Sequence, residues 1–254
     1  MNQELLIRTF SIIITTFLVV TLLIPFIKKI AVQINAIDIP RERHIHKKPI
    51  PKLGGVAIFL GFLVGYMIFG IHTVTMNAVL IGSFLIILTG VVDDIVELKP
   101  MTKFFGQLAA AAVIVFYGNL VMSSISAFGI TWNFPAVISH LVTMIFILGC
   151  INCINLIDGL DGLSGGISSI YFLTVGIISI IQGSFGLEYI LSFIMLGAVL
   201  GFIAYNFHPA TIFAGDSGSM FMGFIISVIA LLGFKNITLT SFNNKFKFFN
   251  TVHR

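Results

Sequence analysis

The chain has 254 residues, of which 57% are hydrophobic and only 9% are charged. A soluble domain averages about 25% charged residues, so this composition excludes an ordinary soluble protein and indicates one embedded in a membrane. The formal net charge of +4 does not predict nucleic-acid binding, because the basic residues cluster in one loop beside an apolar segment, where they orient a membrane protein.

Apolar stretches long enough to cross a bilayer as helices recur along the whole chain, which predicts an all-α, polytopic membrane protein. In chain order they are 8–27, 53–71, 76–92, 104–122, 136–154, 166–182, 187–205 and 218–234. The first stretch does not resemble a cleaved signal peptide, since Lys28 and Lys29 follow it in place of a small-residue cleavage site. The third stretch is short because an acidic pair ends it.

The loop after the first predicted span is strongly basic. It contains Lys28, Lys29, Arg41, Arg43, Lys47, Lys48 and Lys52. By the positive-inside rule this loop is cytoplasmic, so the N-terminus is expected outside the cell. Counting spans then places 93–103, 155–165 and 206–217 on the cytoplasmic side as well.

Acidic residues gather in those same three inner segments. Of the ten in the chain, the segments hold Asp93, Asp94, Glu97, Asp158, Asp161 and Asp216, whereas the outer connections 72–75, 123–135 and 183–186 hold none. Hydrated loop ends are the simple explanation, but they would place acids on both sides. Because Asp and Glu contribute little to membrane orientation, we expect these carboxylates to converge on something that they bind.

The segment GVVDDIVELKP places Asp93 and Asp94 at the end of a predicted span. Adjacent carboxylates repel, so the pair is tolerable if a divalent cation or a shared proton relieves it; a hydrated helix end is the alternative. Lys103 opens the next span, where it can meet an anion or anchor the helix among lipid headgroups.

The segment NCINLIDGLDGLSGG carries Asn152, Asn155, Asp158 and Asp161 at three-residue intervals, which keeps their oxygens near one face of a helix. Turns built by Asp-Gly pairs are the alternative. In NFHPATIFAGDSGS, a Gly/Ser-rich turn at a helix N-terminus presents free N–H groups that suit phosphate, although Asp216 there can equally be an ordinary helix cap. Together these parts suit Mg²⁺-dependent phosphoryl transfer between a soluble substrate and a lipid.

The ordered segments VDDIVELKP, NLIDGLDGL and NFHPATIFAGDSGS resemble the polyprenyl-phosphate N-acetylhexosamine-1-phosphate transferases. The loop HKKPIPKLGG is similar to the branch that begins wall teichoic acid synthesis. This resemblance implies transfer of GlcNAc-1-phosphate from UDP-GlcNAc to undecaprenyl phosphate, with release of UMP, at a bacterial plasma membrane. It implies Mg²⁺ as the cofactor, with Mn²⁺ as a second option, and leaves the oligomeric state open, a homodimer included.

The resemblance also implies roles for individual residues. Asp93 and Asp94 match the catalytic pair, and Asp216 and Asn155 match metal ligands. The positions that match substrate-binding residues are Lys48 and Lys103 near the diphosphate, Asp158 and Asp161 on the nucleotide side, and Asn206 and Phe213 at the base.

The family usually continues for further spans and a cytoplasmic His-x-His-His loop, which this chain lacks. We therefore expect residues 1–242 to form an incomplete transferase domain, 243–254 to be an atypical tail, and the chain as given to be nearly inactive. Two alternatives remain open at this point. One is the phospho-MurNAc-pentapeptide transferase, which shares the acidic motifs, and the other is a cation-coupled transporter, since intramembrane carboxylates often mark ion paths.

Overall fold

The computed structural model describes the backbone of residues 3–39, 49–127 and 130–252, and it describes side chains except those of 126–131 and of residues from 234 on. The elements in chain order are α1 (Gln3–Gln33), β1 (Ile37–Asp38), β2 (Ile50–Pro51), α2 (Gly54–Phe69), α3 (Val74–Val96), α4 (Pro100–Ala112), a π-helical turn η1 (Val113–Tyr117), β3 (Ser124–Ala127), β4 (Ile130–Asn133), α5 (Ala136–Ile157), α6 (Leu163–Ile181), α7 (Leu187–Asn206) and α8 (Gly215–Val252). Each predicted span corresponds to one α-helix, so the predicted all-α membrane fold is confirmed.

Within the described residues, seven helices are long and apolar enough to cross a membrane. The exception is α2, which has 16 residues instead of the 19 predicted for 53–71. At 1.5 Å per residue it is about 24 Å long, shorter than the hydrocarbon core of a typical bilayer. It ends early because the backbone turns to an extended conformation at Gly70.

The third helix is longer than predicted. The stretch 76–92 lies inside α3, whose N-terminus is capped by the Thr73 hydroxyl, which accepts a hydrogen bond from Met76 N at 3.1 Å. At the other end Asp93 and Asp94 belong to the last turn of the helix, and both are buried. The acidic pair did not end the helix because each carboxylate finds donors there.

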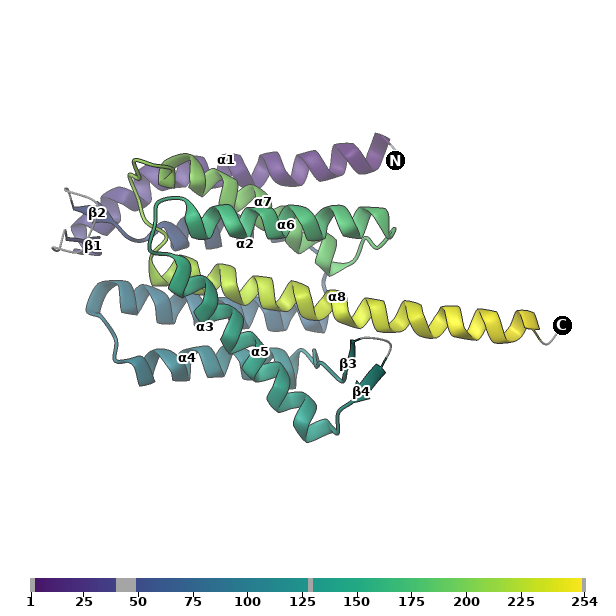
Figure 1. Cartoon of the computed structure of the whole chain (residues 1–254). Helices are drawn as coiled ribbons and strands as arrows, with labels where there is room; N and C mark the ends of the chain where they lie inside the picture. Colours follow the sequence, from purple (N-terminus) through teal and green to yellow (C-terminus); the bar gives the residue numbers. More distant parts are fainter. Residues whose placement is uncertain (1–2, 40–48, 128–129, 253–254) are drawn as a thin grey trace.

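Successive helices run in alternate directions, so the connections fall into two groups (Figure 1). The strands β1 and β2, the α3–α4 and α5–α6 connections and the start of α8 lie at one end of the bundle. The N-terminus and the β3–β4 hairpin lie at the other. We call the first group of connections the inner end; its position relative to the cytoplasm is a prediction.

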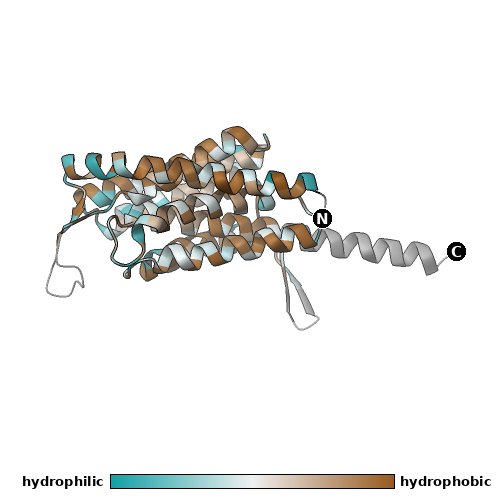
Figure 2. Cartoon of the chain, turned by 90° about the horizontal axis from the view of Figure 1, so that it is seen from above, coloured by the Kyte–Doolittle hydropathy of each residue, from teal (hydrophilic) through white to brown (hydrophobic). Residues whose placement is uncertain are grey.

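The core surrounds α7 and the first part of α8, which are the most buried spans. Helices α1, α2 and α6 pack against α7, while α3 and α5 pack against α8. Phe59, Phe62 and Phe221 meet edge to face or stacked between α2 and α8. Hydrophobic residues continue over the outer faces of the bundle and hydrophilic ones gather towards its ends, as a lipid-embedded protein requires (Figure 2).

Candidate active site

The first turn of α8 is held against the segment that enters α2. Phe213 N donates to Pro51 O at 2.8 Å, and the N–H groups of Gly54 and Gly55 donate to the carbonyls of Phe213 and Ala214, each at 2.9 Å. Gly215 then turns the chain into the helix with a φ of 70°, which a residue with a side chain adopts only under strain. These bonds fix the start of α8, and with it Asp216, at the inner end of the bundle.

Helix α3 approaches the same turn from the other side. A Cβ atom at Gly90 would lie 2.5 Å from Ser217 N, so the two backbones are in direct contact. One turn further along α3, the buried carboxylate of Asp94 accepts hydrogen bonds from Asp216 N at 2.8 Å and Ser217 N at 3.1 Å. Asp94 therefore caps α8 from a neighbouring helix and satisfies two N–H groups that would otherwise lack acceptors.

Four helices contribute one polar side chain each to a cluster beside this cap. Lys103, in the first turn of α4, lies 3.0 Å from Asp93 Oδ2 through its Nζ and also donates to Asp216 Oδ1. The same Nζ lies 3.4 Å from Oδ1 of Asn155, at the end of α5. The Asn155 amide nitrogen donates to Asp216 Oδ1 and to Ser219 Oγ. We call Asp93, Lys103, Asn155 and Asp216 the central cluster.

The two adjacent aspartates of α3 have separate partners. Besides Lys103, Asp93 accepts a hydrogen bond from Leu98 N at 2.6 Å, which secures the turn that leads from α3 to α4. Asp94 faces the first turn of α8 instead. Because successive residues of an α-helix point about 100° apart, the two carboxylates diverge, and each meets positive or partly positive groups. The repulsion inferred from the sequence is thereby offset.

The central cluster fits a magnesium site shared with a phosphorylated substrate. Its donors are two carboxylates and an amide oxygen, and the Lys103 ammonium shows that one cation reaches both carboxylates. Mg²⁺ is usually bound by one or two carboxylates together with waters and substrate phosphates, and seldom by an all-protein cage. Among the described residues, no group of three or more His, Cys, Asp or Glu side chains could hold a metal ion.

A second set of hydrogen bonds ties the α5–α6 connection to the segment 206–212. Asp161 accepts hydrogen bonds from Ala210 N at 3.1 Å and pairs with His208 Nδ1 at 2.9 Å. Asn206 accepts from Gly162 N at 3.0 Å and donates to Ile212 O at 2.8 Å. These contacts order the segment that leads into α8 and so support Asp216 indirectly.

Asp158 lies between the two sets, just after the end of α5, and accepts a hydrogen bond from the Ser164 hydroxyl. Loss of hydration on burial raises the pKa of its carboxyl to about 7, the Ser164 hydrogen bond acts in the opposite direction, and the charge of Asp216 adds to the rise. The carboxyl of Asp158 therefore changes its charge near neutral pH.

The expected convergence of the inner segments is thus observed. Asp93, Lys103, Asn155 and Asp216 form one cluster, and Asp94 caps the helix that carries Asp216. Asp158 and Asp161 lie in the α5–α6 connection, and Asn206 is the last residue of α7. Phe213 is half-buried in the segment before α8. Lys48 lies outside the described residues, so its predicted role stays a prediction.

The sequence did not point to several supporting residues. Gln107 is 1% exposed and exchanges amide hydrogen bonds with Asn152, one of them at 2.9 Å. Ser219 accepts from Asn155. Each lies three or four positions after a predicted site residue, Lys103 or Asp216, and helical spacing would have placed it on the same face.

The sequence has relatives among known proteins. The family model of glycosyl transferase family 4 matches residues 76–234, so the chain belongs to that family. It is 41% identical to a probable undecaprenyl-phosphate N-acetylglucosaminyl 1-phosphate transferase of Bacillus subtilis, over 95% of this chain and 68% of that protein.

Two more distant relatives carry related names. A decaprenyl-phosphate N-acetylglucosaminephosphotransferase of Mycolicibacterium smegmatis is 32% identical, over 79% of this chain and 54% of its own length. A phospho-N-acetylmuramoyl-pentapeptide-transferase of Prochlorococcus marinus is also 32% identical, over 88% of this chain and 66% of its own length. The chain therefore spans between about half and two thirds of these relatives.

Proposed function

We propose that this chain belongs to an enzyme that transfers GlcNAc-1-phosphate from UDP-GlcNAc to undecaprenyl phosphate and releases UMP. The observation that carries the proposal is the central cluster, in which four separate helices supply two carboxylates, a lysine and an amide to one place. The similarity to the B. subtilis relative supports GlcNAc as the sugar, because that protein's name specifies it. Family membership favours this reaction over the transporter considered from the sequence.

The residues of the central cluster suggest how the reaction proceeds. The Oδ2 atom of Asp93 faces the ammonium group of Lys103. From this position it can accept the proton of the lipid phosphate, which increases the negative charge on the attacking oxygen. That oxygen bonds to the sugar-bearing phosphorus, the bond from this phosphorus to the UMP oxygen breaks, and UMP leaves with the electron pair. Lys103 lies where it can stabilise the charge on the diphosphate.

Mg²⁺, or Mn²⁺ in its place, is part of the proposal. Asp216 and Asn155 would hold it, with Asp93 within reach. When bound, the ion supplies charge neutralisation at the diphosphate. Asp94 then supports the site by fixing the turn that carries Asp216, and Asp158, Asp161, Asn206, Phe213 and Lys48 would bind the nucleotide-sugar.

The enzymatic test is UMP release from UDP-GlcNAc and undecaprenyl phosphate with and without Mg²⁺. Asp93→Asn is expected to lower turnover by at least about 10²-fold, because the attacking oxygen loses its base. Glu4→Gln is the matched control, since it removes an exposed carboxylate at the start of α1, which lies at the other end of the bundle from the central cluster. Turnover near wild type in Asp93→Asn would contradict the assigned role.

A parallel assay with UDP-MurNAc-pentapeptide separates this proposal from the alternative that the Prochlorococcus relative raises. Greater activity with that substrate than with UDP-GlcNAc would overturn the choice of sugar. We propose this reaction for the protein that contains residues 1–254. That the product feeds teichoic acid synthesis, and that residues 1–254 alone have little activity, stay predictions.

We further propose that the inner end faces the cytoplasm, as the basic loop 28–52 suggests. In a background without the native thiols Cys150 and Cys153, a cysteine at exposed Leu160 should react with an impermeant reagent only after permeabilisation. A cysteine at exposed Asn133, beyond the β3–β4 turn, should react in intact cells. The reverse labelling pattern would place the active site outside and contradict the use of a cytosolic nucleotide-sugar.

A further inference from the structure

A basic pocket lies beside the strand β2, at the inner end of the bundle. It has a volume of about 590 Å³ and is lined by Pro25, Lys28, Lys29, Val32, Pro51 and Tyr205. This volume is in the range of sites that bind small ligands. No residue of the central cluster lines the pocket, and none of its lining residues is acidic.

Tyr205 lines the pocket and joins α7 to α1 through a hydrogen bond to a carbonyl of α1. Pro25 lacks an N–H group, so the carbonyl of Thr21, four residues earlier, has no helical donor from that position. The Tyr205 hydroxyl donates to Thr21 O at 3.3 Å. The pocket is thus a built junction between two membrane-spanning helices and β2.

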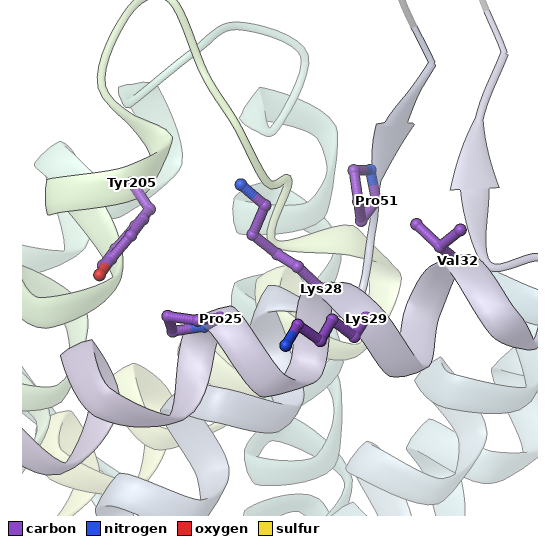
Figure 3. Close-up of a pocket in the computed structure, with 6 residues that line it drawn as sticks. All are labelled: Pro25, Lys28, Lys29, Val32, Pro51 and Tyr205. Atoms are coloured by element: carbon purple, nitrogen blue, oxygen red, sulfur yellow. The ribbon is translucent and has the colours of Figure 1, made fainter.

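Both lysines direct positive charge into this space. In Figure 3 the side chains of Lys28 and Lys29 leave α1 and extend back towards Tyr205 and Pro25. This direction follows from helix geometry, since side chains lean towards the N-terminus of their helix. No ion pair links either ammonium to a carboxylate among the described residues, so the pocket has uncompensated positive charge.

An exposed apolar stripe runs along α1 to the same place. Leu18, Leu22 and Phe26 recur every four residues on one face and are 50%, 68% and 64% exposed. In a bilayer such a stripe contacts acyl chains, and the lysines that follow it lie at the level of the headgroups. An occupant with a negative head and hydrocarbon tails would fit both features at once.

We infer that this pocket binds the phosphodiester headgroup of an anionic phospholipid of the phosphatidylglycerol class, whose acyl chains lie along α1. Lys28 and Lys29 pair with the phosphate, and Pro25, Val32, Pro51 and Tyr205 enclose the glycerol portion. Basic pockets between membrane-spanning helices bind anionic headgroups in this way. This site is distinct from that of the proposed reaction, and its occupation does not depend on a nucleotide.

The test measures lipid binding by the purified full chain in detergent, by native mass spectrometry during titration with phosphatidylglycerol or phosphatidylcholine. Wild type should bind phosphatidylglycerol at least tenfold more tightly than phosphatidylcholine. The double variant Lys28→Gln/Lys29→Gln should lose about 25-fold in affinity for phosphatidylglycerol, roughly fivefold for each lysine, and little for phosphatidylcholine. Lys99→Gln is the matched control, because it removes an exposed lysine of the inner end that does not line the pocket.

Three results would overturn the inference. They are equal binding of the two lipids by wild type, unchanged phosphatidylglycerol binding in the double variant, and displacement of the lipid by millimolar glycerol phosphate, which would indicate a site for soluble phosphates. Should the double variant fail to fold, Lys29→Gln alone decides the question, because Lys29 is exposed and its loss should still cost about fivefold. Because UMP release is measured separately, failure here leaves the proposed reaction untouched.

Discussion

Replacement of Asp94 should destabilise the protein more than it impairs the chemistry of the folded enzyme. Its carboxylate is 3% exposed and accepts hydrogen bonds from Asp216 N and Ser217 N in the first turn of α8. Asp94→Ala leaves the buried N–H group of Ser217 and the partly buried one of Asp216 without acceptors, at a cost of about 1–3 kcal/mol each. The expected loss is therefore about 2–6 kcal/mol in the free energy of unfolding.

Thermal denaturation in detergent, followed by loss of the monodisperse peak in size-exclusion chromatography, measures this effect. A loss of this size lowers the midpoint by roughly 10 °C for a chain of this length. Asp94→Asn should be intermediate, since its amide keeps one acceptor oxygen but turns an NH₂ group towards an N–H donor. Glu4→Gln is the matched control, because it removes an exposed carboxylate at the other end of the bundle.

The result that would refute this reasoning is an Asp94→Asn protein as stable as wild type whose turnover falls by orders of magnitude. Asp94 would then act on the substrate or metal, as the family resemblance implied, and its bonds to α8 would be incidental. If the cap is its main role, the activity that remains should follow the folded fraction at each temperature.

Three further predictions test the packing and the charge balance of the site. Lys103→Met should leave the carboxylates that it bridges to repel each other, and added Mg²⁺ should raise the denaturation temperature more than in wild type. Gly90→Ala should lower the denaturation temperature by several degrees because its Cβ meets the backbone of α8, whereas Gly149→Ala, with open space around its Cβ, should not. Since burial raises the pKa of Asp158 to about 7, its carboxyl should lower folding stability by about 1 kcal/mol between pH 6 and pH 8, and in Asp158→Asn stability should fall by that much less than in wild type.

The gathering of the inner segments could be predicted because it depends only on the number of spans. Each apolar stretch reverses the direction of the chain, so the ends that carry Asp93, Asn155 and Asp216 must share one side. Each of the eight predicted spans corresponds to a helix, but α2 is too short to count among the seven candidate spans of the described residues, and the other errors concern helix boundaries. Capping by Thr73 and the partners of the acidic pair extended α3, and neither is visible in hydropathy.

The division of roles within the site could not be predicted from the sequence. Asp93 and Asp94 are chemically identical neighbours, and the rotation of α3 about its axis decides which one meets Lys103. That rotation is set by the contact of Gly90 with α8, which joins residues far apart in the chain. Asp161 is a similar case, because its pairing with His208 and Ala210 depends on how two connections fold together.

The charge of the central cluster bears on what it can bind. With Asp93 and Asp216 ionised, the two carboxylates and the single ammonium of Lys103 leave one negative charge. A nucleotide diphosphate and a lipid phosphate are both anionic, so neither is attracted to these residues alone. Under the proposed function, an added cation would make the place favourable for both substrates, and it would compete with Lys103 for its carboxylates. The lysine would then be free to pair with phosphate oxygens, which accounts for a cluster that contains one basic residue and two acidic ones.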